Sequence, residues 1–550
     1  MTTNHEVNNP RFVVLSGPVG AGKSTLACGL ELRYNARHIR TQHLMRDYAE
    51  AAGESLPAER KALQEYGERL DRESDGKWVA DRVAEIVATD DDDRTIFVVD
   101  SVRLKSQVDH LRSAFPTRVT HIHVHAPHQV LGERYSERES GLRELSSYEE
   151  VTANATEAAV TKLADDADVS IDSDRCLELD VQTRAAAALR LLPSRSARLV
   201  DVIVGGGYGS EGKGNIAFYL APEYQVLMRV GGPNAGHKVP TTPTPYTHRL
   251  LPSGTQANQT AKILIGPGAT LDLEVLLREI ADCDVDAGRL LIDPQAMIIE
   301  EADKTAEQAA VASIGSTGKG GGAAAARRIN GRNNTVQPPV RLARDVPELA
   351  PYVGQPISEA LESAYAAGER ILLEGTQGTE LSIFHGNYPY VTSRDTTTAG
   401  TLAEAGIGPH RVNRVIMVTR TYPIRVANPP DGTSGPMGQE IDWKDIAERS
   451  GYDEEKLRGT ERGSVSGNRR RVAEFSWHQM RRAAELNGTT DIALTFTDYI
   501  DKNNADARRY DQLSSETIQF IEDIERVAGA PVTLIATRFD RRSVIDRREW

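Results

Sequence analysis

The chain of 550 residues contains little cysteine and no long apolar run. Its cysteines, Cys28, Cys176 and Cys283, are scattered and form no close pair of the metal-binding or redox type. Such sparse thiols suit a reducing cytosol. The first residues, MTTNHEVNNPRF, lack the basic and apolar segments of a secretory signal, and no apolar run approaches the roughly 20 residues of a membrane span. We therefore expect a cytoplasmic protein that does not act at a membrane.

Basic residues are outnumbered by acidic ones. The 65 Lys and Arg residues face 79 Asp and Glu residues, which gives a formal net charge of -14. This balance argues against broad attraction to nucleic acid, although it leaves room for local basic pockets that bind small phosphates. The acidic run Asp90–Asp93 is interpreted as a solvated loop. With 39% apolar residues and this length, the chain is expected to form two or more globular domains.

A first glycine-rich turn follows an apolar stretch near the N-terminus. The segment RFVVLSGPVGAGKSTLACGLELRY predicts a strand over Phe12–Leu15 and a helix over Ser24–Tyr34. Between them stands the P-loop pattern G-x-x-x-x-G-K-[ST]. Backbone N–H groups of such a turn cradle phosphate oxygens, its lysine reaches the terminal phosphates, and its hydroxyl can ligate Mg²⁺. The residues assigned to this P-loop are Gly17, Gly22, Lys23, Ser24 (also the Mg²⁺ ligand) and Thr25.

Further residues of a kinase site are predicted downstream of the P-loop. The segment TIFVVDSVR indicates a buried strand ending at Asp100, where P-loop kinases place an acid near the magnesium or the acceptor phosphate. Arg134 and Arg138 stand four apart in ERYSERE, on one face of an expected helix, where they could close over phosphates or be solvated. These motifs resemble nucleoside monophosphate kinase-like P-loop proteins over residues 11–190. Between residues 40 and 79, where the acceptor would bind, no feature indicates a particular base.

A domain boundary is expected near LLPSRSARLVDVIVGGG. A helix rich in alanine and leucine is predicted to end at Leu192, a polar linker to follow over residues 193–197, and a new strand to begin near Val200. The predicted domains are therefore residues 1–192 and residues 198–550.

The second domain begins with another glycine-rich turn, GGGYGSEGKGN. Its glycines 207, 209 and 212 fit G-x-G-x-x-G, a pattern also found in dinucleotide-binding folds. Two observations weigh against that interpretation. The turn continues into Lys213 and Gly214, which is typical of a phosphate turn, and GGPNAGHKV stands where a ribose-binding acid would be expected.

A set of sequence blocks resembles a known family, the adenylosuccinate synthetases. In the family's order, the blocks are YGSEGKGN, VGGPNAGHKV, HRLLPSG, IGPG, IGSTGKGGG, LLEGTQGTELSIFHGNYPYVTSRDTTTAG, GSVSGNRRR and LTFTDYID. The resemblance covers about residues 198–550. It implies an α/β domain with a large central sheet, behind an N-terminal α/β domain with a parallel sheet and flanking helices. It also implies a ligase in which a nucleoside triphosphate phosphorylates the purine 6-oxo oxygen and the amine of L-aspartate then displaces phosphate.

The resemblance implies roles for single residues on the donor side. His237 matches the catalytic histidine that hydrogen-bonds the moving phosphoryl group, and the Gly236 carbonyl would face Mg²⁺. Asp498, in TFTD, matches the acid that reads the guanine of GTP. The donor phosphates are expected at Glu211, Gly212, Lys213 and Gly214, with Lys213 also catalytic.

The resemblance likewise implies the acceptor and aspartate sites. Arg470, in SVSGNRRR, matches an arginine that grips the aspartate carboxylates, with Ser466 in the same segment. An arginine from a partner subunit normally completes the acceptor site, which implies a homodimer; here Arg328 or Arg332 could serve. The acceptor nucleotide itself is expected at Asn234, Thr317, Gln377 and Thr392.

Several positions depart from the family's pattern. Asn468 stands where the family usually has an arginine close to the ribose and the aspartate. Arg538, in ATRFDRR, replaces a small residue that flanks the donor base, so ATP becomes a candidate donor beside GTP. Ser210 replaces an aspartate that takes the proton from purine N1 and helps to bind Mg²⁺, and serine does neither job as well.

Ser210 therefore bears on the choice of acceptor. A serine leaves room for the 2-amino group of a guanine nucleotide and can accept a hydrogen bond from it. The same substitution is a feature of a phage branch of the family that makes 2-aminoadenylosuccinate from dGMP. We therefore favour dGMP as acceptor. The alternatives are an ordinary synthetase acting on IMP with an unusual base, a paralogue whose base has decayed, and a nucleotide sensor without turnover.

Overall fold

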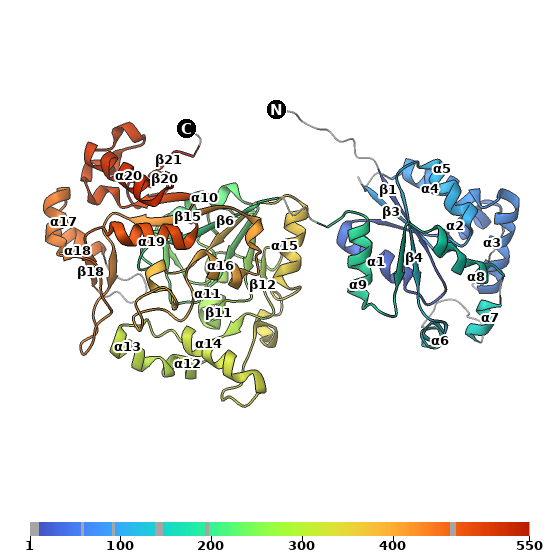
Figure 1. Ribbon diagram of the computed structural model, residues 1–550, viewed down its shortest axis with the longest axis horizontal. Helices are drawn as coiled ribbons and strands as arrows, with labels where there is room; N and C mark the ends of the chain where they lie inside the picture. Colours follow the sequence, from blue (N-terminus) through green and yellow to red (C-terminus); the bar gives the residue numbers. More distant parts are fainter. Residues whose placement is uncertain are drawn as a thin grey trace. The chain divides into compact units, whose positions relative to one another are not determined.

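The computed structural model of the chain forms two compact units, Met1–Leu192 and Pro193–Trp550 (Figure 1). It describes residues 10–54, 56, 60–90, 94–137, 147–153, 155–192, 197–461 and 469–548. Arg138, Ser466, Asn468, the acidic positions 91–93 and most of the expected linker lie outside the described residues. Within the described residues, no helix is long and apolar enough to cross a membrane.

The N-terminal unit is built on a parallel sheet with the strand order β2-β3-β1-β4-β5. Its strands are β1 (Arg11–Ser16), β2 (Arg37–Arg40), β3 (Ile96–Asp100), β4 (Val119–His125) and β5 (Val169–Asp172). Its α-helices are α1 (Lys23–Tyr34), α2 (Thr41–Ala51), α3 (Arg60–Ser74), α4 (Lys77–Ala88), α5 (Lys105–Ala114), α6 (His128–Ser136), α7 (Tyr148–Thr152), α8 (Ala155–Val160) and α9 (Glu178–Ala188).

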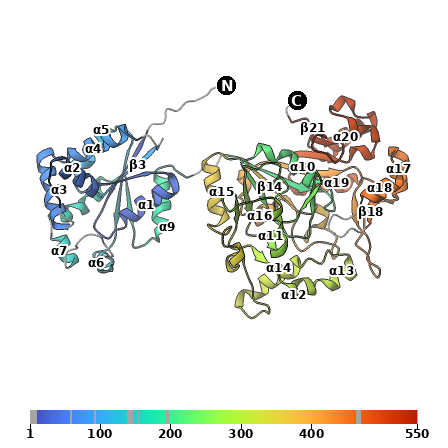
Figure 2. The same ribbon diagram turned by 180° about the vertical axis from the view of Figure 1, so that it is seen from behind.

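Both faces of this sheet are covered by helices, which explains why the central strands β1 and β3 are buried along almost their whole length. Val13 and Leu15 of β1 point into a core shared with α1 and α9, while Phe12 and Val14 point into a core shared with α4 and α5 (Figures 1 and 2). This alternation follows from the two-residue period of a strand. The P-loop leaves the carboxyl end of β1, between β3 and β4, where ligands of open α/β sheets bind.

The C-terminal unit is built on a larger sheet with the order β12-β10-β7-β14-β6-β15-β19-β20-β21. Neighbouring strands are parallel except for the last pair, β20 and β21. The strands of this sheet are β6 (Val200–Gly205), β7 (Val226–Arg229), β10 (Lys262–Ile265), β12 (Leu290–Ile292), β14 (Ile371–Glu374), β15 (Val412–Arg420), β19 (Asp491–Thr495), β20 (Val532–Ala536) and β21 (Val544–Asp546). Smaller sheets pair β8 (His237–Val239) with β9 (Tyr246–His248), β11 (Thr270–Leu271) with β13 (Met297–Ile298), and β18 (Arg470–Ala473) with β16 (Ile424–Val426) and β17 (Glu440–Ile441).

Helices cover the large sheet on both sides. Alternate residues of β6 pack in opposite directions: Val202 and Val204 lie in the main core, and Ile203 packs with Ile216 and Ala217 of α10 (Figures 1 and 2). The α-helices are α10 (Lys213–Leu220), α11 (Leu273–Asp282), α12 (Glu301–Ala306), α13 (Gln308–Ile314), α14 (Gly321–Asn330), α15 (Ile357–Ala366), α16 (Thr398–Ala405), α17 (Trp443–Ser450), α18 (Glu454–Thr460), α19 (Trp477–Asn487) and α20 (Ser515–Ala528).

The predicted fold class is confirmed, but two helix ends differ from expectation. The helix expected to end at Leu192 ends at Ala188, because Arg190 takes a left-handed conformation with a φ of 54° that breaks the helical path. Helix α6 ends at Ser136, so it carries Arg134 but does not extend to Arg138 as predicted.

Candidate active sites

The P-loop of the N-terminal unit has the geometry of a phosphate-binding turn. Gly17 has a φ of 136°, and a Cβ there would lie 1.9 Å from the Val124 carbonyl oxygen, so no other residue fits. Helix α1 begins at Lys23, whose Nζ donates hydrogen bonds of 2.8 Å to the carbonyls of Gly17 and Pro18. The lysine is thus folded back over the turn, where a phosphate group would meet it together with the helix N-terminus.

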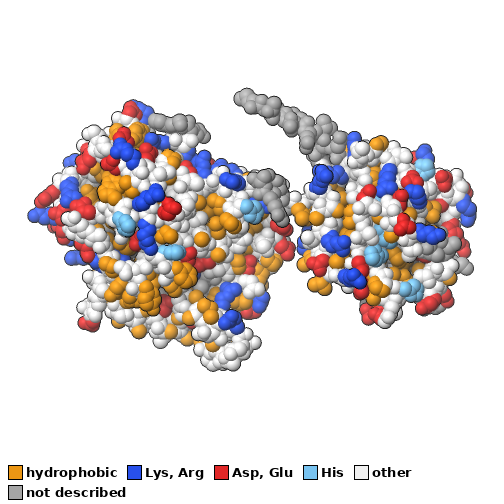
Figure 3. Space-filling view, in the orientation of Figure 1, with side chains coloured by type: hydrophobic (Ala, Val, Ile, Leu, Met, Phe, Trp, Pro, Cys, Tyr) orange, Lys and Arg blue, Asp and Glu red, His pale blue; other side chains and the backbone are white. Residues whose placement is uncertain are grey.

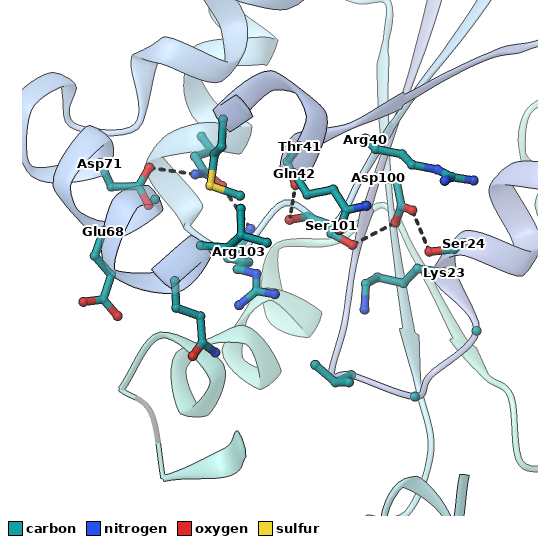
Figure 4. A pocket seen from close by; sticks show the side chains of 18 of the residues that line it. Lys23, Ser24, Arg40, Thr41, Gln42, Glu68, Asp71, Asp100, Ser101 and Arg103 are labelled. Atoms are coloured by element: carbon teal, nitrogen blue, oxygen red, sulfur yellow. Dashed lines mark hydrogen bonds between the residues drawn. The ribbon is translucent and has the colours of Figure 1, made fainter. Parts of the chain in front are cut away.

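Asp100 lies beside the P-loop hydroxyl, as the sequence predicted. The Ser24 hydroxyl donates to Asp100 Oδ2 at 2.8 Å (Figure 4), and His38 Nε2 lies 3.1 Å from the same oxygen. Burial alone would raise the pKa of Asp100, but the hydrogen bonds with His38 and Ser24 and the charge of Lys23 together lower it. Asp100 is therefore a carboxylate at neutral pH, and with Ser24 it presents the oxygen ligands that Mg²⁺ prefers.

A cavity of about 510 Å³ opens from this turn. Lys23, Ser24 and Asp100 lie at one end of it (Figure 4), and Thr25 is also among the residues that line it. Arg134 also lines the cavity, but its guanidinium donates to the side chain and backbone of Ser173, at 2.9 and 3.1 Å. A volume of this size is within the roughly 300–1,000 Å³ of small-molecule sites.

The second glycine-rich turn, Gly206–Gly212, joins β6 to α10 and is closed by its own glutamate. Glu211 Oε1 accepts hydrogen bonds from the backbone N–H groups of Gly207 and Gly209, at 3.1 and 2.6 Å. Its Oε2 lies 2.8 Å from Lys213 Nζ, and both side chains are buried. The predicted donor-phosphate residues, which include Gly212 and Gly214 at the start of α10, thus form one continuous turn.

Two arginines hold Ser210 at the rim of this turn. The Arg470 guanidinium donates to the Ser210 hydroxyl oxygen, and Arg420 donates to the Ser210 carbonyl at 3.1 Å. Arg470 is largely buried, and this burial lowers the pKa of its guanidinium. The structure thus brings together the predicted base position and the predicted aspartate-binding arginine.

Arg420 belongs to a buried cluster that the sequence did not reveal. Its guanidinium donates to Glu461 at 2.9 Å and stacks over Phe496, with 3.9 Å between the guanidinium carbon and the ring centre. The Tyr499 hydroxyl donates to the same Glu461 oxygen at 2.7 Å. The cluster therefore holds Arg420 in place, and Arg420 in turn binds the Ser210 carbonyl.

His237 stands at the start of β8, against the first turn of α10. A Cβ on Gly214 would lie 2.8 Å from that of His237, so this glycine lets the histidine approach the phosphate turn. His237 Nδ1 is hydrogen-bonded to Glu374, which also accepts from the backbone and the hydroxyl of Ser253 at 2.7 and 2.5 Å. Burial and the nearby charge of Arg229 lower the pKa of His237. Its buried Nε2 has no partner among the described residues.

The predicted acceptor residues make two sets of contacts. Gln377 Nε2 donates to the Thr392 hydroxyl at 2.6 Å, and the Gln377 backbone lies against Gly209, whose added Cβ would meet its Cα at 3.1 Å. Asn234 lies against the start of α14, where a Cβ on Gly321 would be 3.3 Å from its Oδ1; this buried oxygen has no hydrogen-bond partner in the described parts of the chain. Thr317 is exposed in the turn that leads to α14.

The N-terminus of α14 already holds a carboxylate. Glu307 accepts hydrogen bonds from the backbone N–H groups of Gly320, Gly322 and Ala323, at 2.8, 2.6 and 3.2 Å. Helix N-termini bind phosphates through such groups. Glu307 therefore occupies the kind of site that a 5'-phosphate would take beside Asn234.

The two arginines predicted for a partner's site differ in their surroundings. Arg328 donates to the carbonyls of Pro267 and Gln295 in its own chain, at 3.2 and 2.8 Å. Arg332 is exposed, and its Nε donates to the Ile329 carbonyl at 2.8 Å.

Asp498, the residue predicted to read the donor base, is buried. Its Oδ2 accepts from the Tyr452 hydroxyl at 3.0 Å, while the buried Oδ1 has no partner in the described part of the chain. Burial raises the pKa of Asp498 to about 6. Arg538 is turned toward other acids, with ion pairs of 3.3 Å to Asp506 and 3.8 Å to Asp540.

Sequence reasoning missed Glu374 and Arg420, which support His237 and Ser210. A signal was present, because each is a charged residue at the carboxyl end of a buried parallel strand, β14 and β15. Charges at that edge of an α/β sheet commonly face a ligand site.

Comparisons with known proteins agree with this geometry. The adenylosuccinate synthetase family model matches residues 202–338 and 339–505, and an AAA domain model matches residues 16–152. The adenylosuccinate synthetase of Methanocaldococcus jannaschii is 39% identical over 356 residues, which cover 63% of this chain and 96% of that protein. The enzyme of Pyrococcus horikoshii is 39% identical over 360 residues, which cover 63% of this chain and 98% of the relative.

Solved structures show the same fold. The succinoaminodeoxyadenylate synthetase of cyanophage S-2L, bound to dGMP and to dATP as an energy donor, superposes with a TM-score of 0.54 at 30% identity, covering 64% of this chain and 96% of its own. The adenylosuccinate synthetase of Plasmodium falciparum gives 0.55 at 19% identity, covering 64% and 100%. The resemblance found in the sequence is thus confirmed: the chain belongs to the adenylosuccinate synthetase family, as a ligase with a P-loop kinase-like domain before it.

Proposed function

We propose that the C-terminal unit joins L-aspartate to the 6-oxo position of a purine ribo- or deoxyribonucleoside monophosphate, with dGMP preferred over IMP. One observation carries the preference: a serine, not a carboxylate, stands at residue 210, and Arg470 donates to its hydroxyl oxygen. A hydroxyl oxygen has two lone pairs, so it can accept a further hydrogen bond from a 2-amino group. An aspartate there would be larger and would pair with Arg470 instead.

The reaction has two steps. The purine O6 attacks the γ-phosphorus of the donor triphosphate while the bond to the β,γ-bridging oxygen breaks, so the nucleoside diphosphate leaves and the N1 proton is released. The amine of L-aspartate then attacks C6, the C6–O6 bond breaks, and inorganic phosphate leaves. The amine loses a proton, and the product is the 6-succinylamino nucleotide.

The described residues suit these steps. Lys213 and the N–H groups of the turn would hold donor phosphates, and His237 Nε2, once protonated, would donate to the moving phosphoryl group. The adjacent Glu374 carboxylate favours that protonated form, whereas burial and the charge of Arg229 oppose it, so the negative charge of the donor phosphates would be needed to protonate His237. Arg470 would bind an aspartate carboxylate in the geometry that guanidinium groups favour. Asn234, Thr317, Gln377 and Thr392 would hold the acceptor nucleotide.

One solved relative supports the preference for dGMP. The cyanophage synthetase, 30% identical to this chain, is described as bound to dGMP and dATP. A dATP donor also agrees with the replacement of a small residue by Arg538, which makes an adenine donor a candidate beside GTP.

Mg²⁺ fits the two units unequally. In the N-terminal unit, the Ser24 hydroxyl and the Asp100 carboxylate, 2.8 Å apart, are suitable oxygen ligands. In the C-terminal unit the Gly236 carbonyl could serve, but the Ser210 hydroxyl faces the Arg470 guanidinium, and a cation beside it would be repelled. When bound, Mg²⁺ would neutralise charge on the donor phosphates.

We also propose that the N-terminal unit transfers a phosphoryl group from ATP to a nucleoside monophosphate. An oxygen of the acceptor phosphate attacks the γ-phosphorus, and ADP leaves as the bridging bond breaks. Lys23 and the P-loop N–H groups would hold the donor, and Asp100 would orient Mg²⁺. Arg134, tied to Ser173, would line the phosphate path.

Two further proposals concern the whole protein. A homodimer would complete each acceptor site, and Arg332 is the better candidate to cross because it is exposed, whereas Arg328 is half-buried and donates to two carbonyls of its own chain. A cytoplasmic setting suits the free thiols of Cys28, Cys176 and Cys283.

Ser210→Asp tests the proposed contact. With dGMP as acceptor, we expect the variant to lose about 10-fold in kcat/KM, because the added carboxylate crowds the 2-amino group and attracts Arg470. Ser210→Ala, which removes only the hydroxyl, should lose less. The measurement is release of phosphate and formation of the succinyl product. An unchanged or higher rate of Ser210→Asp on dGMP would contradict the proposal.

A further inference from the structure

The cavity of the N-terminal unit extends well beyond the P-loop, to the junction of α3 and α4. Lys23, Ser24 and Asp100 lie at one end in Figure 4, and Glu68 and Asp71 lie at the other. The phosphates of a donor account only for the first end. The second end must face the acceptor, if the proposed phosphoryl transfer holds.

The cavity changes in chemical character along its length. Lys23 and the exposed Arg40 give the part near Asp100 a positive charge, whereas Arg103, which also lines the cavity, is paired with the buried Glu157. Met45, Leu63 and Trp78 line it farther on with apolar surface. A ligand that matches has an anionic group near the P-loop and a flat, largely apolar body beyond it, as a nucleoside monophosphate does.

Asp71 sits at the far end as a fixed acceptor. Its Oδ1 receives hydrogen bonds from Trp78 Nε1 at 2.7 Å and from Gln107 Nε2 at 2.8 Å. Its Oδ2 has no hydrogen-bond partner among the described residues, and the residue lines the cavity. The side-chain amide nitrogen of Gln64, which also lines the cavity, is buried and unpartnered in the described part of the chain.

This arrangement selects one edge of a purine. A carboxylate accepts hydrogen bonds and donates none, so it favours bases that present N–H groups. Guanine presents N1–H and the 2-amino group side by side, and 2,6-diaminopurine presents the 2-amino group. Adenine and hypoxanthine lack the 2-amino group, so at the N1–C2 edge hypoxanthine offers only N1–H and adenine offers no N–H donor.

We propose that this cavity is the acceptor site for a purine nucleoside monophosphate that carries a 2-amino group, with Asp71 Oδ2 accepting from that group. Arg40 lies where it can face the acceptor phosphate. The proposal rests on the phosphoryl transfer proposed for this unit and specifies its substrate class. Both units of the chain would then recognise the same edge of the purine, through Asp71 in one and Ser210 in the other.

Binding without a donor nucleotide tests the proposal. Isothermal titration of the full chain with GMP and IMP isolates the 2-amino group, since the two ligands differ only there. Binding at the ligase acceptor site is separated by repeating both titrations in Gln377→Ala, which removes a residue expected to hold the acceptor nucleotide in the C-terminal unit. We expect at least 10-fold tighter binding of GMP than of IMP at the N-terminal site, a discrimination typical of a lost hydrogen bond to a charged group. Equal affinities would overturn the proposal.

Asp71→Asn sharpens the test. The Asn oxygen can still accept from Trp78 and Gln107, while its NH₂ group now faces the cavity, so the fold is retained and the acceptor becomes a donor. The preference for GMP over IMP should fall to about 3-fold or less. Asp75→Asn is the matched control, because Asp75 lies just after α3 with its side chain 89% exposed and in a left-handed conformation that Asn tolerates. A full preference retained in Asp71→Asn would overturn the role of Asp71.

Two further experiments complete the test. The first compares two bases that both carry a 2-amino group, and the second separates acceptor binding from phosphoryl transfer. Titration with dGMP and with 2-amino-2'-deoxyadenosine monophosphate shows which base binds more tightly, and binding of neither would overturn the proposal. Transfer of labelled phosphate from ATP is measured separately. Binding with the expected preference but without transfer would refute the kinase and leave the acceptor specificity standing.

Discussion

The two glycine-rich turns each place a lysine at the start of a helix, but the two lysines hold different groups. Lys23 donates to the neutral carbonyls of Gly17 and Pro18 and opens onto a cavity of about 510 Å³. Lys213 is paired with the carboxylate of Glu211, whose other oxygen binds two N–H groups of the turn. In these contacts the lysine of the first turn meets neutral carbonyl oxygens, whereas the lysine of the second turn meets a carboxylate of its own chain.

This difference shows what a phosphate-turn motif leaves undetermined. Both motifs create a set of N–H groups and a cation, and both follow from glycines at the carboxyl end of a buried strand. Whether these N–H groups bind a ligand or a carboxylate of the same chain depends on one nearby residue, which is Glu211 in the second turn. Glu211 and Glu307 both act as anions at helix or turn N–H groups of the C-terminal unit, so we expect its ligands to displace internal carboxylates.

The largest expected effect comes from removing each lysine in turn. Lys23→Ala should lower phosphoryl transfer by the N-terminal unit by about 1,000-fold, and Lys213→Ala should lower ligase activity similarly, because each loses a charge that stabilises the transferring phosphoryl group. Each variant should leave the other activity within about 2-fold. Separate assays of ADP formation and of the succinyl product measure both. Loss of both activities in either variant would show that the turns do not act independently.

Glu211→Gln tests the closed state of the second turn. Gln can still accept from the backbone N–H groups, but Lys213, only 1% exposed, would lose its counter-charge. We expect the C-terminal unit to lose about 3 kcal/mol in unfolding free energy, as is typical when one partner of a buried ion pair is removed. Denaturant unfolding followed by circular dichroism measures this loss.

The control for Glu211→Gln is Glu274→Gln, which breaks an exposed pair with Arg278. It should change the unfolding free energy by less than about 0.5 kcal/mol. Equal effects of the two substitutions would mean that the Glu211–Lys213 pair does not hold the turn closed.

A pH experiment contrasts the carboxylates of the two units. Asp100 has a lowered pKa and stays ionised, whereas burial raises the pKa of Asp498 to about 6. Below that pH Asp498 is protonated and can no longer accept both donors of a guanine base. Ligase kcat/KM for GTP should therefore fall about 10-fold for each pH unit below 6, while the N-terminal activity should lack this dependence. A pH-independent KM for GTP would remove Asp498 from the donor-base site.

Glu307→Gln should have the smallest effect. Gln keeps an oxygen at the N-terminus of α14 but removes the charge that competes with an acceptor 5'-phosphate. The KM for dGMP in the ligase reaction should fall about 3-fold, consistent with the small energy of a charge at a helix terminus. An increased KM would show that Glu307 helps the phosphate to bind. The KM of the N-terminal reaction should not change, because Glu307 belongs to the C-terminal unit and the first turn of α1 carries no comparable acid.

Local sequence determined what could be predicted. The strands β1 and β6, their glycine turns and the Ser24–Asp100 contact follow from apolar runs, from glycine spacing and from the rule that carboxyl ends of parallel strands meet. The roles assigned to Ser210, His237 and the acceptor residues remain predictions, although the structure brings Ser210 and Arg470 together.

Long-range pairs could not be predicted in this way. Glu374 meets His237 across 137 residues, and Arg420 meets Glu461 across 41, so neither pairing has a sequence period. Asp71 was also missed, because its acceptor role depends on Trp78 and Gln107 reaching it from two other helices. Such sites depend on how elements pack, and packing leaves no local pattern.

We propose that Ser210 adapts the ligase to a purine with a 2-amino group, and one assay tests this most directly. Purified protein would be given L-aspartate, Mg²⁺ and either GTP or ATP, with dGMP or IMP as the acceptor, while phosphate release and the succinyl product are quantified. We predict product from dGMP at a kcat/KM at least 10-fold above that for IMP, since IMP lacks the 2-amino group. Product from IMP but not from dGMP would contradict the claim and indicate an ordinary adenylosuccinate synthetase, and no product from any combination would indicate a nucleotide sensor.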